Sequence, residues 1–154
     1  MKLYLVQHGD AVTKDIDPER PLSDRGVQDV GAIAEHLKAT VPVVAHIIHS
    51  GKLRAQQTAE ILAKTAFPQA MIAVHDSINP LDLPTVIAEE IDQWQEDTMI
   101  VGHLPFLAKL VTLLVADHEE PVVVAYSPGT VVCLDNKEGV WRIEWMLSPA
   151  LVVK

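Results

Sequence analysis

Long apolar runs are absent from this chain, and cysteine is nearly so. No apolar stretch approaches the ~20 residues that a membrane-spanning helix needs, and the N-terminus begins with a strand pattern instead of a charged leader. We therefore expect a cytoplasmic protein that does not contact a membrane. The single cysteine, Cys133, excludes an intramolecular disulfide and fits a reducing compartment. Because it lies in the apolar run 129–134, we expect it to be a small buried hydrophobe.

Positive charge is also scarce. The chain has four arginines and a formal net charge of −9, which argues against broad contact with nucleic acid. A phosphate ligand would have to be bound locally, by a few donors and by helix N-termini. No pair among the seven histidines has the i, i+4 helical spacing of a zinc site, so we expect no metal.

What the chain does contain is an alternation of apolar strands and amphipathic helices. Its 154 residues, 49% of them hydrophobic, fit one domain with a substantial core. The expected order is strand 2–7, helix 23–40, strand 43–49, helix 53–66, strand 71–74, helix 85–95, strand 98–102, helix 105–114, and strands 121–126, 129–134 and 140–147. The last three are predicted to be antiparallel edge strands on an α/β core. The fold class is thus a three-layer α/β/α arrangement around a mixed, mostly parallel sheet.

Three junctions between a strand and a helix carry polar residues that are suited to chemistry. His8 follows the first strand, Arg54 lies just after the second, and His103 follows the strand 98–102. Ligands of open α/β sheets bind beyond the carboxyl ends of the strands, so the three junctions are expected to line one crevice. A guanidinium there can bind two phosphate oxygens, and a histidine facing them can attack phosphorus to form a phosphohistidine that water hydrolyses.

Each of these residues also has a structural interpretation. A strand-end histidine is often only a hydrogen-bonding group, and an isolated arginine such as Arg54 often forms a surface ion pair. His49 precedes a turn and can simply cap the end of its strand. We assign no role to the other histidines, which are expected on the surface of helices, strands or loops: His36, His46, His75 and His118.

Four motifs in order strengthen the functional interpretation. They are His8-Gly9-Asp10-Ala11, the run from Arg20 to Gly26, the run from Ser50 to Ala59, and Val101-Gly102-His103-Leu104-Pro105. In this order they resemble the histidine phosphatase superfamily, and the match looks closest to its small SixA-type phosphohistidine phosphatases. The similarity covers nearly the whole chain, including Ser127-Pro128-Gly129-Thr130 before a late strand.

The resemblance implies a phosphoglycerate mutase-like fold and a single domain, 1–154, without a large cap insertion. It implies that His8 is the phosphorylated nucleophile, that Arg54 binds phosphate, and that His103 is the second histidine of the pocket. No metal or organic cofactor is needed. An open groove would admit a phosphorylated protein or a small phospho-compound. The nitrogen leaving group of a phosphoramidate departs readily once it is protonated, and the candidates for an assisting acid are Asp15, Asp17 and Asp82.

Gln7 departs from the family pattern, in which arginine precedes the nucleophilic histidine. Glutamine donates hydrogen bonds without charge, and loss of one such contact costs ~2–4 kcal/mol of transition-state stabilisation. Arg20 and Lys52 are candidates for compensating this loss, which would otherwise leave the activity weak or absent. The predicted phosphate-binding set is Gln7, Gly9, Arg20, Arg54 and His103. Two alternatives therefore remain open at this point: an inactive member that binds a phosphorylated partner, and a phosphomonoesterase acting on a small metabolite.

Overall fold

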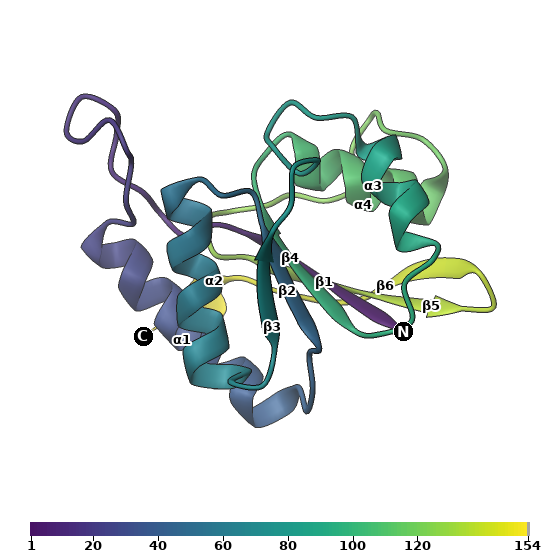
Figure 1. The fold of residues 1–154 in the computed structure, drawn as a ribbon, viewed down its shortest axis with the longest axis horizontal. Coiled ribbons are helices and arrows are strands. Elements are labelled where there is room, and N and C mark those ends of the chain that lie inside the picture. The colour runs from purple at the N-terminus through teal and green to yellow at the C-terminus, as the bar shows by residue number, and fades with distance from the viewer. Residues whose placement is uncertain (154) are drawn as a thin grey trace.

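The computed structural model describes residues 1–153, which form one six-stranded sheet with helices on both faces (Figure 1). The sheet order is β3-β2-β4-β1-β5-β6. Strands β1 to β4 pair in parallel, whereas β5 and β6 are antiparallel, so the predicted mixed sheet is confirmed. The strands are β1 (Lys2–Gln7), β2 (His46–His49), β3 (Met71–Val74), β4 (Thr98–Gly102), β5 (Val131–Lys137) and β6 (Val140–Leu147), and the helices are α1 (Asp24–Thr40), α2 (Leu53–Ala66), α3 (Pro84–Ile91), α4 (Phe106–Ala116) and the short η1 (Pro149–Leu151).

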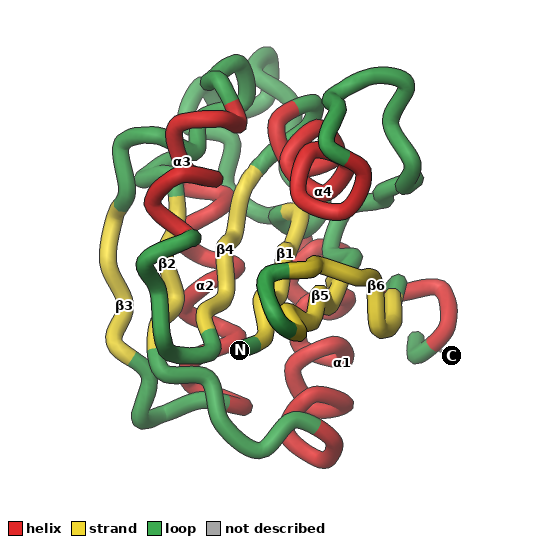
Figure 2. The backbone as a smooth tube through the Cα atoms, turned by 90° about the vertical axis from the view of Figure 1, so that its right-hand side faces the viewer, coloured by secondary structure: helices red, strands yellow, loops and turns green. Residues whose placement is uncertain are grey.

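Helices α1 and α2 cover one face of the sheet, and α3 and α4 cover the other (Figure 2). Alternation along β1 divides the core accordingly. Tyr4 and Val6 pack toward α1 and α2, while Leu3 and Leu5 pack toward α3 and α4. Successive side chains of a strand point to opposite faces, so a central strand covered on both sides must be apolar at every position. β1 therefore reads as a continuous apolar run up to Gln7.

The longest helix, α1, has 17 residues and mixes charged with apolar positions. It buries Val30, Ile33 and Leu37 and exposes the opposite stripe, as expected of a surface helix. Among residues 1–153, no helix is both long enough and apolar enough to cross a membrane.

The start of α1 is tied to the loop that follows β1. Ser23 caps the helix by accepting the N–H of Gly26 at 3.0 Å, and its hydroxyl donates to the carboxylate of Asp10 at 2.6 Å. Any Cβ at position 26 would overlap the backbone of Asp10. Glycine is therefore required where the loop after β1 crosses the helix.

Two expected elements are shorter in the structure. The strand predicted at 43–49 begins only at His46, because its neighbours β3 and β4 offer their first partners, Met71 and Thr98, at that residue. The helix predicted at 85–95 ends at Ile91, where the chain leaves through turns closed by the N–H groups of Gln93 and Trp94.

The strand predicted at 121–126 was wrong. The sheet ends at β3 on one side and at β6 on the other, and this β-branched segment pairs with neither edge strand. Its polar groups instead bind elsewhere: the N–H of Val123 donates to Thr112 Oγ1 on α4 at 3.0 Å, and the Tyr126 hydroxyl donates to the carbonyl of Leu5 at 2.9 Å.

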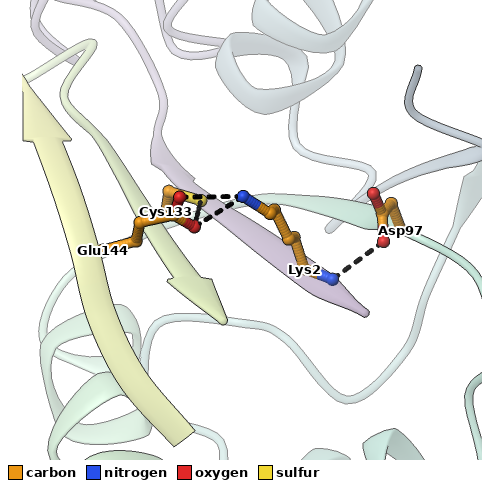
Figure 3. A network of polar contacts seen from close by, with 4 residues as sticks. All are labelled: Lys2, Asp97, Cys133 and Glu144. Atoms are coloured by element: carbon orange, nitrogen blue, oxygen red, sulfur yellow. Dashed lines mark hydrogen bonds and ion pairs between the residues drawn. The ribbon is translucent and has the colours of Figure 1, made fainter. Parts of the chain in front are cut away.

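A polar network crosses the amino-terminal end of β1 (Figure 3). The backbone N–H of Lys2 donates to Asp97 at 2.8 Å, and its ammonium pairs with Glu144 of β6 at 2.7 Å. The same carboxylate lies 3.8 Å from the thiol of Cys133, which is fully buried as predicted. Burial, with the nearby charge of Glu144, raises the pKa of that thiol to about 12.

Candidate active site

His8 stands at the carboxyl end of β1, directly before the loop leading to α1. The backbone N–H of His8 donates to the carbonyl of Gly102 at 3.0 Å, which ties this residue to the end of β4. Its Nδ1 lies 2.8 Å from the carbonyl oxygen of Gly9, which can only accept, so Nδ1 carries the ring proton. The other nitrogen, Nε2, carries no proton and accepts a hydrogen bond from the Nε–H of Arg54 at 3.3 Å.

The surroundings of His8 keep its ring neutral. Burial is the main cause that lowers its pKa to about 4, and the charges of Arg54 and Arg20 lower it further. The hydrogen bond to Gly9 and the charge of Asp10 oppose this effect. At neutral pH the Nε2 lone pair is therefore unprotonated, which is the state that a nucleophilic histidine needs.

Gly9 holds the end of β1 and His8 in place. Its N–H donates to Thr58 Oγ1 at 3.0 Å, and the Thr58 hydroxyl donates in turn to the carbonyl of Arg54. A Cβ on Gly9 would lie 2.6 Å from the side chain of Val30, so only glycine fits. In this conformation the N–H of Gly9 is occupied by Thr58 and is not a free phosphate donor.

Arg54 lies in the first turn of α2, half-buried beside His8. The N-terminus of this helix has no side-chain cap and no acidic residue in its first turn, so its positive dipole end is uncompensated. The preceding turn depends on Gly51, whose φ of +87° favours glycine, and the N–H of Gly51 donates to Nδ1 of His49 at 3.1 Å. His49 thus serves the turn at the end of β2.

His103 follows β4 and faces His8, with 5.0 Å between the ring centroids. The residue is 1% exposed. Its Nε2 lies 2.6 Å from Ser50 Oγ, and its buried Nδ1 has no partner among residues 1–153. Burial chiefly lowers its pKa to about 3, helped by His8 and by the charges of Arg54, Lys52 and Arg20. Like His8, it is neutral at pH 7.

Arg20 and Lys52 contribute positive charge to this site. Arg20 has a left-handed backbone with φ of 51°, and its Nε donates to the carbonyl of Val12 at 3.0 Å. Its charge lowers the pKa of His8, Arg54 and His103, whereas the charge of Lys52 acts on His103. The protein therefore gathers a small group of cations within a chain whose net charge is −9.

Gln7 is 8% exposed, and its Oε1 is buried without a hydrogen-bond partner in the described part of the chain. In the sheet it pairs with Gly102, the last residue of the neighbouring strand β4, and each of these two residues directly precedes one of the histidines. An unpaired buried amide oxygen costs about 1–3 kcal/mol, which a core position would not normally tolerate. Unpaired buried polar groups of this kind are found where a residue serves a ligand site.

The other candidates lie apart from these residues. None of the three expected acids hydrogen-bonds to either site histidine: Asp15 is fully exposed, Asp17 binds the N–H of Glu19, and Asp82 binds the N–H of Asn79. Two histidines without an assigned role, His46 and His75, pair with surface glutamates. Within residues 1–153, no group of three or more histidine, cysteine, aspartate or glutamate side chains is arranged to hold a metal ion.

Ser50 and Thr58 belong to the site, although the sequence singled out neither. Both lie inside the run from Ser50 to Ala59, and Thr58 stands one helical turn after Arg54. That spacing places its hydroxyl on the face of α2 that meets the loop after β1. The contact of Ser50 with His103 has no such signal, because it links the ends of two strands that are far apart in the sequence.

Comparison with known proteins agrees with this architecture. The profile of the histidine phosphatase superfamily (branch 1) matches residues 3–79. Phosphohistidine phosphatase SixA of Escherichia coli K12 is 22% identical, over 97% of this chain and 94% of its own. The structure of the protein histidine phosphatase SixA complexed with tungstate has a TM-score of 0.87 at 20% identity and covers 98% of this chain and 99% of its own. A phosphoglycerate mutase from Bacillus anthracis str. Sterne has a TM-score of 0.76 at 13% identity, covering 99% and 95%.

These matches confirm the predicted phosphoglycerate mutase-like fold. The chain belongs to the histidine phosphatase superfamily.

Proposed function

We propose that this protein is a phosphohistidine phosphatase, which removes the phosphoryl group from phosphohistidine on a protein or from a small phospho-compound. The observation that carries this proposal is the unprotonated Nε2 of His8, 3.3 Å from the Nε of Arg54. Membership of the superfamily supports the phosphatase chemistry, and the relative from Escherichia coli is itself named a phosphohistidine phosphatase.

In the first half of the reaction, Nε2 of His8 attacks the phosphorus and the bond from phosphorus to the substrate nitrogen breaks. The leaving imidazole takes up a proton from solvent water, and phosphohistidine forms on His8. The hydrogen bond from Nδ1–H to the carbonyl of Gly9 stabilises the positive charge that develops on the attacking ring. Arg54 and His103 bind the phosphoryl oxygens during transfer.

In the second half, water attacks the phosphorus of phosphorylated His8 and releases inorganic phosphate. The lone pair then returns to Nε2, and the enzyme is ready for another cycle. An imidazole is a good leaving group once protonated, so this substrate class demands less of a dedicated acid than a phosphate ester does. That requirement fits a site in which none of the three candidate aspartates contacts a histidine.

The proposed phosphate-binding set consists of Arg54, His103, Arg20 and Gln7, and it leaves out the N–H of Gly9 because Thr58 already accepts it. Arg20 supplies part of the charge that the arginine of other family members would bring at position 7, because its guanidinium already acts on both site histidines. Gln7 contributes a neutral amide. Gly9 contributes the close backbone approach that orients His8.

The two alternative functions have less support. A metabolite phosphomonoesterase needs a carboxylic acid close to the leaving group, and the expected aspartates are exposed or bound to loop N–H groups. A binding-only member would explain Gln7, but it would not require the neutral, oriented His8 that the site provides.

The test is to incubate the protein with a phosphohistidine-containing protein and, separately, with an aryl phosphate, and to trap any acid-labile phosphoenzyme. We expect phosphate release and a trapped intermediate with the phosphohistidine protein, both lost in His8→Ala and retained in His118→Ala, which changes an exposed histidine. No release and no intermediate, with phosphate binding that still depends on Arg54, would leave only the binding function.

A further inference from the structure

The ring of His103 is held by one hydrogen bond in the described part of the chain. Nε2 lies 2.6 Å from Ser50 Oγ, and the buried Nδ1 has no partner. Functional histidines are normally oriented by hydrogen bonds that fix both the ring plane and the protonated nitrogen. The placement of His103 against His8 therefore depends on a single hydroxyl.

The direction of this hydrogen bond follows from the proposed role of His103. Its ring has to donate to a phosphoryl oxygen, and Nε2 is already in contact with Ser50, so Nδ1 is the donor and Nε2 accepts the hydroxyl hydrogen of Ser50. A neutral imidazole has one accepting and one donating nitrogen. Donation from Ser50 to Nε2 thus places the ring proton on Nδ1.

The fold brings Ser50 to this position through the strand register. β2 and β4 are parallel neighbours, and His49 pairs with Val101, so the residues that follow each strand emerge side by side. The turn at Gly51, with its φ of +87°, then leads the chain into α2 and leaves the hydroxyl beside His103. A Cβ at Gly51 would lie 3.2 Å from the side chain of Val74, so this turn has little room to change.

We propose that Ser50 is a positioning residue that fixes the ring orientation and the protonated nitrogen of His103 for phosphoryl transfer. This inference rests on the proposed function. Ser50 acts through His103 and keeps the ring in one tautomer, facing His8. Without the hydroxyl, the ring has no described hydrogen bond and both neutral tautomers become accessible, so only part of the population presents the reactive arrangement.

The kinetic test compares Ser50→Ala with Ser50→Thr, which keeps a hydroxyl, and with Ser77→Ala, a matched control whose hydroxyl makes no hydrogen bond to the described residues. Outer hydrogen bonds that orient a metal-bound histidine are worth about 10- to 100-fold in activity, and by analogy we expect kcat of Ser50→Ala to fall by that factor with a smaller change in KM. Thr should recover most of the loss. Donation to Nε2 favours the neutral ring, so its removal should raise the pKa of His103 and move the acid limb of the kcat profile to higher pH.

Ring ¹⁵N spectra of His103 keep the proposal testable even if Ser50→Ala folds poorly. The wild-type protein should show the proton on Nδ1, and Ser50→Ala should show a mixture of tautomers. A wild-type proton on Nε2, or an alanine variant with unchanged spectrum and kcat, would overturn the role of Ser50. A wild-type protein with the expected tautomer but no hydrolysis of phosphohistidine would instead show that the proposed function is wrong.

Discussion

Gln7 ends β1 beside His8 with a buried, neutral amide, while the positive charges around the two histidines come from Arg54, Arg20 and Lys52. Position 7 pairs with Gly102, so it lies within the sheet at the point where both histidines emerge. Its Oε1 has no partner in the described structure. Replacement of Gln7 by arginine therefore removes the unpaired amide oxygen and adds a positive charge at the same time.

We expect Gln7→Arg to raise kcat for phosphohistidine hydrolysis by about 10- to 100-fold. One preorganised donor at the transferring group is worth about two to three orders of magnitude, and the proposed contribution of Arg20 already supplies part of that effect. Single-turnover rates of phosphoenzyme formation would measure the gain. Gln93→Arg, at an exposed position after α3, is the matched control and should leave the rate unchanged. An unchanged rate in Gln7→Arg would mean that Arg20 already provides this charge.

Arg20 is tested by removing its charge while keeping its backbone. Asparagine tolerates the left-handed conformation better than other non-glycine residues, so Arg20→Asn retains the turn at φ of 51°. Loss of the guanidinium should raise the pKa of His8 and His103 and move the acid limb of the rate profile to higher pH, with lower kcat/KM at neutral pH. Arg142→Asn on exposed β6 should change neither quantity. If Arg20→Asn behaves in the same way as this control, Arg20 does not compensate for Gln7.

Among the elements, the crossing of the loop after β1 with α1 can be tested with two glycines of the same helix. Gly26→Ala should destabilise the protein by more than about 2 kcal/mol, because its Cβ overlaps backbone and no flexible side chain can move aside. Gly31→Ala meets nothing within 4 Å and should stabilise the helix by about 0.5–1 kcal/mol. Urea unfolding of both variants measures the difference, and equal effects would contradict the close crossing.

Most elements could be predicted from the sequence because their patterns are local. The apolar run of β1 and the helical spacing of Val30, Ile33 and Leu37 specify burial on their own. The segment 121–126 could not be predicted in this way, since Val122–Val124 has the composition of a strand but pairs with neither edge strand of the sheet, β3 or β6. Pairing is a property of the whole sheet, which a single segment does not encode.

The candidate site, too, was predictable only where general rules of the fold apply. His8, Arg54 and His103 each follow a parallel strand, so the general rule for open sheets brings them together. The hydrogen bonds between Gly9 and Thr58, and between Ser50 and His103, join residues 49 and 53 positions apart. Such contacts depend on side-chain direction at the end of each strand, and no periodicity in the sequence reports it.

For the whole molecule, the partly buried His8 and the buried His103 predict how stability depends on pH. Their folded pKa values are about 4 and about 3, whereas an unfolded histidine titrates near 6.5. As pH falls below about 6.5, the unfolded chain gains protons that the folded protein does not bind, so the free energy of unfolding decreases until the pH passes the folded pKa values. The expected loss between pH 7 and pH 5 is roughly 2–4 kcal/mol.

Urea unfolding at these two pH values measures that loss. The double variant His8→Gln/His103→Gln should reduce the dependence on pH, and His118→Gln, at an exposed position, should retain it. An unchanged dependence in the double variant would mean that other groups, such as surface carboxylates, cause it.

The lone thiol of Cys133 has a practical consequence. It lies fully buried on β5, between β1 and β6, and its pKa of about 12 leaves almost no thiolate at neutral pH. An alkylating reagent can therefore label the protein only when these strands separate. Because the chain has no second cysteine, every labelling event reports on Cys133. The labelling rate, followed by mass spectrometry, therefore measures how often the centre of the sheet opens, without any engineered probe.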